Sequence, residues 1–124
     1  MEKGTKTSNL TRGMWGERKA AEYFKNKGYL LLERNFRCRT GEIDIVAKDG
    51  DFLVFAEVKT RTRTDKGLPG QFIDQKKMKR IIKSAEYYVL WRPELRKYQP
   101  RFDVVELLAT QGGVYIRHIK NAFS

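Results

Sequence analysis

The spacing of apolar residues along the chain predicts two helices and five strands. Apolar side chains recur at helical intervals in two segments and alternate or run continuously in five shorter ones. The predicted helices span 10–27 and 72–91, and the predicted strands span 29–36, 42–48, 52–60, 101–109 and 114–119. This order, αβββαββ, predicts one α/β domain over 10–124 with a mixed sheet flanked by helices, preceded by a flexible polar tail at 1–9.

The charge balance of the chain narrows the classes of partner. Its 124 residues include 26 Lys or Arg and 15 Asp or Glu, a formal net charge of +11. Such an excess favours a polyanionic partner, nucleic acid first. No run approaches the roughly 18 apolar residues of a membrane span, and no signal-like segment is present, so we expect a cytoplasmic protein without a membrane partner.

The scarcity of cysteine and histidine restricts the chemistry further. The chain has one of each, Cys38 and His118, so it can form no internal disulfide and none of the familiar Cys/His zinc patterns. Both are expected to be structural. Any metal ion in this protein is therefore expected to have oxygen ligands.

The most apolar predicted strand carries an unexpected pair of charges near its end. The run from Phe52 to Val58 is interrupted only by Glu57 and is followed by Lys59. Charges at the end of a buried strand are costly without partners, and side chains two residues apart point to the same side of a strand. One interpretation is an ion pair at the edge of the sheet; the other is a functional site.

The preceding strand supports the functional interpretation. Alternation places Glu42 and Asp44 on one side and Ile43, Ile45 and Ala47 on the other. The sequence Asp-Gly predicts a hairpin between the two strands.

Two registers are open for this hairpin, and both bring acids together. A two-residue turn at 49–50 would place Glu42 opposite Glu57, with Asp44 diagonal to it, whereas a four-residue loop would place Asp44 directly opposite Glu57. Carboxylates this close repel unless a cation lies between them, and the natural cation for oxygen ligands alone is Mg²⁺ or Mn²⁺. A carboxylate-bound divalent ion beside Lys59 suits phosphodiester hydrolysis. A basic nucleic-acid binder with an incidental acidic pocket is the alternative.

These motifs also resemble those of a known protein superfamily. The segment GEID at 41–44, followed by EVK at 57–59, resembles the D…E-x-K core of the PD-(D/E)xK nuclease superfamily, especially the archaeal Holliday-junction resolvases. More closely, the chain resembles the bacterial YraN family of uncharacterised endonuclease-like proteins. The matching positions are Gly16-Glu17, Gly28-Tyr29, Asn35, GEID, EVK, Arg61, Lys77, Arg101-Phe102-Asp103 and Asn121-Ala122-Phe123.

The resemblance implies a restriction-endonuclease-like core with a defined set of site residues. It implies that Asp44 and Glu57 bind the metal and that Lys59 assists the attacking water. It also implies that Glu17 of the first helix completes the catalytic site, although a solvated glutamate is the simpler interpretation. Glu42 is either a third metal ligand or a group supporting the ligands. Ile43 stands where the superfamily usually has proline.

Basic residues follow directly after this site. The expected nucleic-acid contacts are Arg61, Arg63, Lys66, Gln75, Lys76, Lys77 and Arg80. The sequence thus predicts a Mg²⁺- or Mn²⁺-dependent endonuclease acting on DNA rather than RNA, with branched DNA as a candidate substrate. Symmetric cutting of two strands would call for a homodimer. The alternatives are a non-catalytic nucleic-acid-binding protein of the same fold and an RNA-processing accessory protein.

Overall fold

The computed structural model describes residues 12–62 and 74–124 and confirms the predicted order of elements. The elements are α2 (Arg12–Asn26), β1 (Leu30–Cys38), β2 (Gly41–Asp49), β3 (Phe52–Thr62), α3 (Gln75–Trp91), a 3₁₀ turn (Pro93–Leu95), β4 (Gln99–Thr110) and β5 (Gly113–Phe123). The predicted tail at 1–9 lies outside the described residues. Neither described helix has the length and hydropathy needed to cross a membrane.

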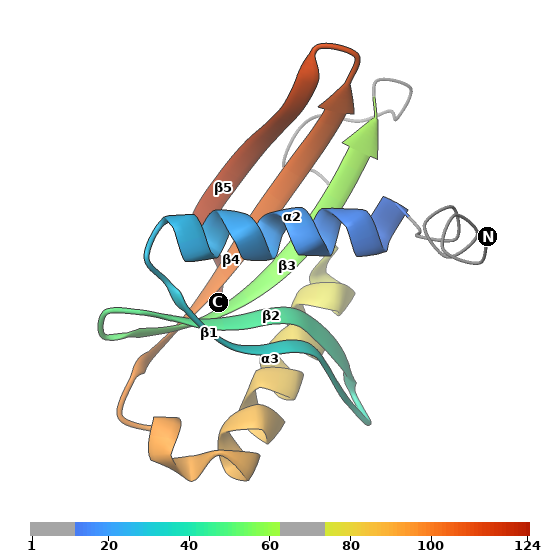
Figure 1. The fold of residues 1–124 in the computed structure, drawn as a ribbon. Coiled ribbons are helices and arrows are strands. Elements are labelled where there is room, and N and C mark those ends of the chain that lie inside the picture. Colours follow the sequence, from blue (N-terminus) through green and yellow to red (C-terminus); the bar gives the residue numbers. More distant parts are fainter. Residues whose placement is uncertain (1–11, 63–73) are drawn as a thin grey trace, which may run out of the picture.

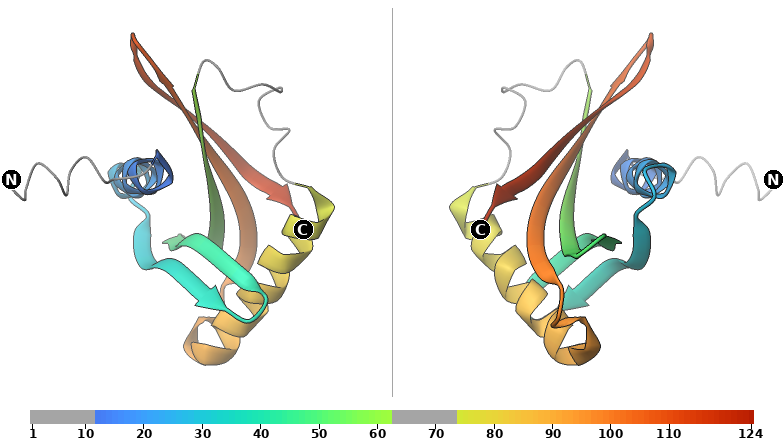
Figure 2. Two further views of the ribbon diagram at one scale, coloured as in Figure 1. Left: turned by 90° about the vertical axis from the view of Figure 1, so that its right-hand side faces the viewer. Right: turned by 90° about the vertical axis from the view of Figure 1, so that its left-hand side faces the viewer.

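The five strands form one mixed sheet in the order β1-β2-β3-β4-β5. All neighbouring pairs are antiparallel except β3 and β4, which run parallel and are connected through α3. This follows the general rule that parallel neighbours need a long crossover, usually helical. Figure 2 shows α2 and α3 on opposite sides of the sheet. A mixed sheet covered in this way is consistent with a restriction-endonuclease-like α/β fold.

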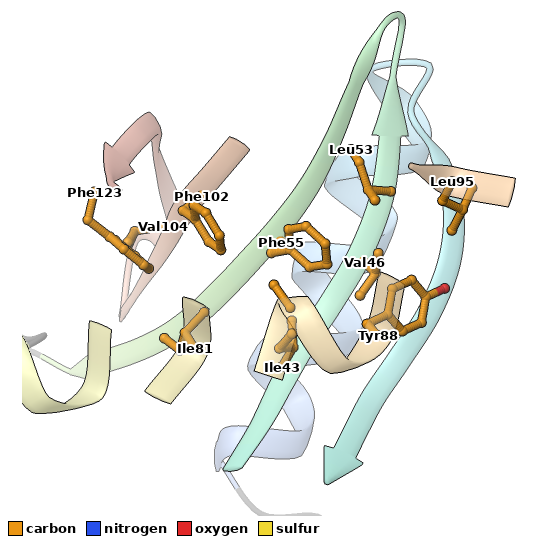
Figure 3. Packing of buried hydrophobic residues seen from close by; sticks show 11 residues of the cluster. Ile43, Val46, Leu53, Phe55, Ile81, Tyr88, Leu95, Phe102, Val104 and Phe123 are labelled. Atoms are coloured by element: carbon orange, nitrogen blue, oxygen red, sulfur yellow. The ribbon is translucent and has the colours of Figure 1, made fainter. Parts of the chain in front are cut away.

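Two apolar clusters hold the helices against the sheet. On the α3 side, Ile81 and Tyr88 pack against Val46, Phe55 and Phe102 (Figure 3). On the α2 side the cluster contains Ala20, Ala21, Phe24, Val54, Ala56, Val105 and Leu107. Because β3 contributes to both clusters, it is buried on both sides, as its nearly continuous apolar sequence predicts.

A buried polar network anchors the last strand. The fully buried Asp103 accepts hydrogen bonds from Arg101 Nε and Nη2 (both 2.9 Å), from His118 Nε2 (2.8 Å) and from the Asn121 N–H (3.0 Å). Burial alone would raise the pKa of Asp103, but these hydrogen bonds outweigh burial and lower it. Asp103 is therefore ionised and fully satisfied, which gives Arg101, Asp103, His118 and Asn121 a structural role, whereas Phe102 and Phe123 of the same segments pack in the α3-side cluster.

Candidate active site

The β2–β3 hairpin sets the position of the acidic residues. Asp49 pairs with Phe52 and Ile45 pairs with Ala56, so the turn consists of residues 50–51. Continued by one position, this register would bring Asp44 opposite Glu57, but the pairing ends at Ile45 and Ala56. The alternative register, with a turn at 49–50, is wrong, because Gly50 adopts the positive φ of 60° and takes the turn one residue further along.

Asp44 lies where β2 separates from β3. The pairing of the two strands ends at Ile45, and beyond this point Oδ2 of the buried Asp44 accepts a hydrogen bond of 2.8 Å from the Val58 N–H. The Val58 N–H has no partner on the β2 backbone, because the pairing has ended, and the Asp44 side chain accepts its hydrogen bond instead. Asp44 is held by the backbone of the strand that carries Glu57.

The separation of the strands also corrects one prediction. Alternation placed Ile43 on the same side as Ile45, but Ile43 packs in the α3-side cluster and Ile45 in the α2-side cluster. Beyond Ile45, β2 is no longer paired with β3, and the regular alternation of its side chains between the two sides of the sheet is broken at Asp44.

Glu57 is buried and paired with a lysine from α3. Its Oε2 lies 2.5 Å from Lys77 Nζ, and the lysine side chain remains 43% exposed. Asp74 caps α3 by accepting a hydrogen bond of 2.8 Å from the Lys77 N–H, which fixes the lysine backbone in the first turn. Burial alone would lower the pKa of Lys77, but the hydrogen bond and charge of Glu57, with the charge of Asp44, raise it. Lys77 is therefore a fully charged partner of the acid pair.

The acids face a small pocket of about 190 Å³. It is lined by Gly41, Glu42, Asp44, Glu57, Lys77, Arg80 and Ile81. Glu42 is exposed at the rim, where its Oε1 lies 3.2 Å from Arg37 Nε. The structure thus gathers three of the four acids of the predicted site around one cavity, with Asp44 and Glu57 buried and Glu42 exposed at the rim.

The electrostatics of the pocket centre on Asp44. Burial raises the pKa of Asp44 to about 8, and the charges of Glu57, Glu17 and Glu42 raise it too, whereas the Val58 hydrogen bond lowers it. Near neutral pH this carboxyl group therefore holds a proton in the absence of a further cation. The contribution from Glu17 shows that this α2 acid is within electrostatic reach of Asp44.

A close approach of α2 to β3 positions Glu17. Gly16 is buried, and a Cβ atom at this position would lie 1.8 Å from Thr60 Oγ1. Glycine therefore lets the helix approach the strand at the residue preceding Glu17. This explains why the two residues form one motif.

Gly16→Ala is expected to destabilise the protein by about 1–2 kcal/mol, because the clash with Thr60 outweighs the higher helix propensity of alanine. Gly13→Ala, an exposed position on the same helix, is the matched control and should stabilise by up to about 1 kcal/mol. Urea denaturation measures both. Adding Thr60→Ala should recover part of the loss, and a neutral Gly16→Ala variant would contradict the packing argument.

The donor set fits a small divalent cation. Within residues 12–62 and 74–124, no three His, Cys, Asp or Glu side chains are grouped closely enough to hold a metal ion by themselves. Mg²⁺, however, is commonly held by one or two carboxylates, with water and substrate phosphate completing its octahedron. Asp44 and Glu57 provide that number of ligands in a pocket open to a substrate.

Comparison with known proteins gives the family. The model of the uncharacterised protein family UPF0102 matches residues 16–107, a span that includes Glu17, Asp44, Glu57 and Lys59. The chain belongs to the UPF0102 family. A UPF0102 protein from Clostridium botulinum strain 657 is 50% identical over 117 residues, covering 93% of this chain and 95% of the relative. One from Persephonella marina is 46% identical over 112 residues, covering 90% and 92% respectively. The YraN resemblance is thereby confirmed.

The remaining predicted residues of this UPF0102 protein fall into three groups. Lys59 is half-buried and lies two residues beyond Glu57, on the same side of β3. Gln75, Lys76 and Arg80 are exposed on the first turns of α3, where Arg80 also lines the acidic pocket. Arg63 and Lys66 lie outside the described residues.

Arg61 requires a correction. The sequence predicts a nucleic-acid contact, but the residue is buried and its Nε lies 2.6 Å from Glu106 Oε2 of β4. A strand 45 residues away in sequence supplies this partner, so local sequence could not reveal it. Its charge is compensated inside the protein rather than presented on the surface.

The sequence does not predict which basic residues pair with the acids of the pocket. It assigned Lys77 to phosphate binding, whereas the structure pairs this residue with Glu57. It gave no role to Arg37, which pairs with Glu42 at the rim. Asp74 is of a residue type favoured at helix N-caps and could have indicated that Lys77 lies in the first turn, but the direction of the lysine side chain depends on how α3 packs against the sheet.

Proposed function

We propose that this UPF0102 protein is a divalent-metal-dependent endonuclease that hydrolyses phosphodiester bonds in DNA, with branched DNA as its candidate substrate. The observation that carries the proposal is the pair of buried acids, Asp44 and Glu57, that lines one pocket, with Lys59 two residues further along the strand. Burial and the neighbouring charge of Glu57 raise the pKa of Asp44, and a buried, perturbed acid in a pocket is a candidate functional group.

In the proposed reaction, water attacks phosphorus while the bond from phosphorus to a sugar oxygen breaks. The leaving oxygen takes up a proton. Asp44 and Glu57 would hold Mg²⁺ or Mn²⁺, which would neutralise charge on the phosphate and lower the pKa of water. Lys59 orients the attacking water and stabilises the negative charge that develops on the phosphate oxygens. Glu17, within electrostatic reach of Asp44, helps to orient the water.

The surface beside the pocket suits a phosphate backbone. Lys76 and Arg80 are exposed on α3, and Gln75 adds a neutral hydrogen-bonding group at its start. Together with the net charge of +11, these groups favour nucleic-acid contacts that position the substrate without reading its sequence. A symmetric homodimer would supply the second site needed to cut both strands of a junction.

The test is incubation of the full chain with labelled duplex, flap, four-way-junction and single-stranded DNA, with and without Mn²⁺. Metal-dependent cleavage of at least one substrate is expected, with a purified Glu57→Gln variant as the control against contaminating nucleases. If the wild-type protein binds these DNAs but cleaves none of them with any divalent metal, the non-catalytic binding function replaces the proposal. The same panel in RNA tests the choice of nucleic acid.

The apparent affinity for Mn²⁺ should rise about tenfold per pH unit from about pH 6 to pH 8 and then level off. Below its pKa of about 8, Asp44 carries a proton that must leave before its oxygen can bind a metal. Higher pH removes this competition, so affinity increases with pH and not the reverse. Calorimetric titration in buffers of different ionisation enthalpy measures both the affinity and the released proton. An affinity that stays constant over this range would contradict the role of Asp44.

A further inference from the structure

The ammonium group of Lys77 lies where a cation for the acid pair is needed. Its Nζ is 2.5 Å from Glu57 Oε2, and the charge of Asp44 also acts on it. Glu57 is almost completely buried, with 7% of its side chain exposed, so an unpaired charge there would be costly. The structure therefore already contains a cation that neutralises Glu57.

We propose that Lys77 is the resident cation of this pocket, which holds Glu57 in the metal-free protein and withdraws when a divalent cation binds. The inference rests on the proposed function and extends it, since it assigns to Lys77 a competition with the metal rather than a simple phosphate contact. Lys77 is a positioning residue in this scheme, because it acts through Glu57.

The two cations exclude each other for electrostatic and steric reasons. A dication bound to Glu57 would lie a few ångströms from the ammonium group, and like charges at that distance repel strongly in a partly buried setting. The pocket of about 190 Å³ is shared by Asp44, Glu57 and Lys77. Binding of the dication therefore favours departure of the ammonium group from Glu57.

Lys77 can leave without any change in the fold. Its side chain is 43% exposed and ends on a flexible four-carbon stem, so rotation carries the ammonium into solvent. Its backbone stays fixed by the hydrogen bond to Asp74 that caps α3. The withdrawn ammonium would lie beside Arg80 at the pocket rim, where a substrate phosphate can take the place of Glu57 as its partner.

The test is Mn²⁺ titration of the full chain without nucleic acid, comparing wild type with Lys77→Met, which keeps the stem and removes the charge. The variant should bind Mn²⁺ at least about fivefold more tightly, because the metal no longer displaces an ion pair. Its metal-free form should melt at a lower temperature and gain more from Mn²⁺ than wild type does. Lys79→Met, an exposed lysine on the same helix, is the matched control and should match wild type in both measurements.

The outcomes separate this inference from the proposed function. Equal or weaker Mn²⁺ binding by Lys77→Met, with binding by wild type intact, overturns only the role of Lys77. Tight Mn²⁺ binding by Lys77→Met with none by wild type would give the competition between Lys77 and the metal its strongest support. If neither protein binds Mn²⁺, the metal site fails and the inference fails with it. Lys77→Gln, which can still donate a hydrogen bond to Glu57, provides the same comparison should Lys77→Met fold poorly.

Discussion

Glu57→Gln is expected to lose Mn²⁺ binding and at least about 10³-fold in cleavage rate. The amide keeps the volume of the buried side chain but removes the negative charge that a divalent cation needs. A metal ion contributes several kcal/mol of transition-state stabilisation in hydrolysis, and each 1.4 kcal/mol corresponds to about tenfold in rate. Calorimetry with Mn²⁺ and single-turnover cleavage of the best substrate measure the two losses.

Glu22→Gln is the matched control for this variant. Glu22 is exposed on α2, where it lies 3.9 Å from Lys19, so its replacement should leave metal binding and cleavage unchanged. Circular dichroism checks that both variants are folded. A folded Glu57→Gln protein that cleaves at the wild-type rate would remove Glu57 from the mechanism.

Lys59→Ala is expected to lower the cleavage rate by about 10²–10³-fold while Mn²⁺ affinity and DNA affinity change little. A lysine has only donors and cannot bind a metal ion, so its removal leaves the ligand set intact. Its charge acts on negative charge that develops in the transition state, and losing one such group commonly costs about 10²–10³ in rate. Single-turnover rates, metal titration and a DNA-binding assay separate these effects.

The control for Lys59 is Lys25→Ala, which removes the same charge from an exposed position in the last turn of α2. It should cleave at the wild-type rate. If Lys59→Ala instead loses metal binding in parallel with activity, the lysine acts by holding the acids and not on the reacting phosphate. A folded Lys59→Ala variant with an unchanged rate would exclude any role of the residue in the reaction.

The acid pair was predictable because it depends on strand parity alone. Asp44 and Glu57 belong to one hairpin, and both possible registers place them on the same side of the sheet. Moving the turn from 49–50 to 50–51 therefore leaves the two acids together. Ile43 was placed on the wrong side because alternation assumes an unbroken strand, whereas β2 leaves β3 at Asp44. No periodicity in the sequence marks the residue at which two strands separate.

The contacts that sequence could not predict are those made between distant elements. Arg61 lies beside Glu106 because β4 pairs with β3, and Lys77 reaches Glu57 because α3 packs on that side of the sheet, mainly against β2. Asp103 likewise gathers Arg101, His118 and Asn121 through the pairing of β4 with β5. Motifs identified these residues as important, but tertiary packing determined their partners.

The most direct test of the metal site is the anomalous difference map of crystals grown with Mn²⁺. The proposed function predicts one strong peak between the carboxylates of Asp44 and Glu57, within about 2.0–2.4 Å of an oxygen atom from each. A peak bound elsewhere, or no peak at saturating Mn²⁺ with Lys77 still paired to Glu57, would contradict a metal-dependent nuclease centred on these two acids.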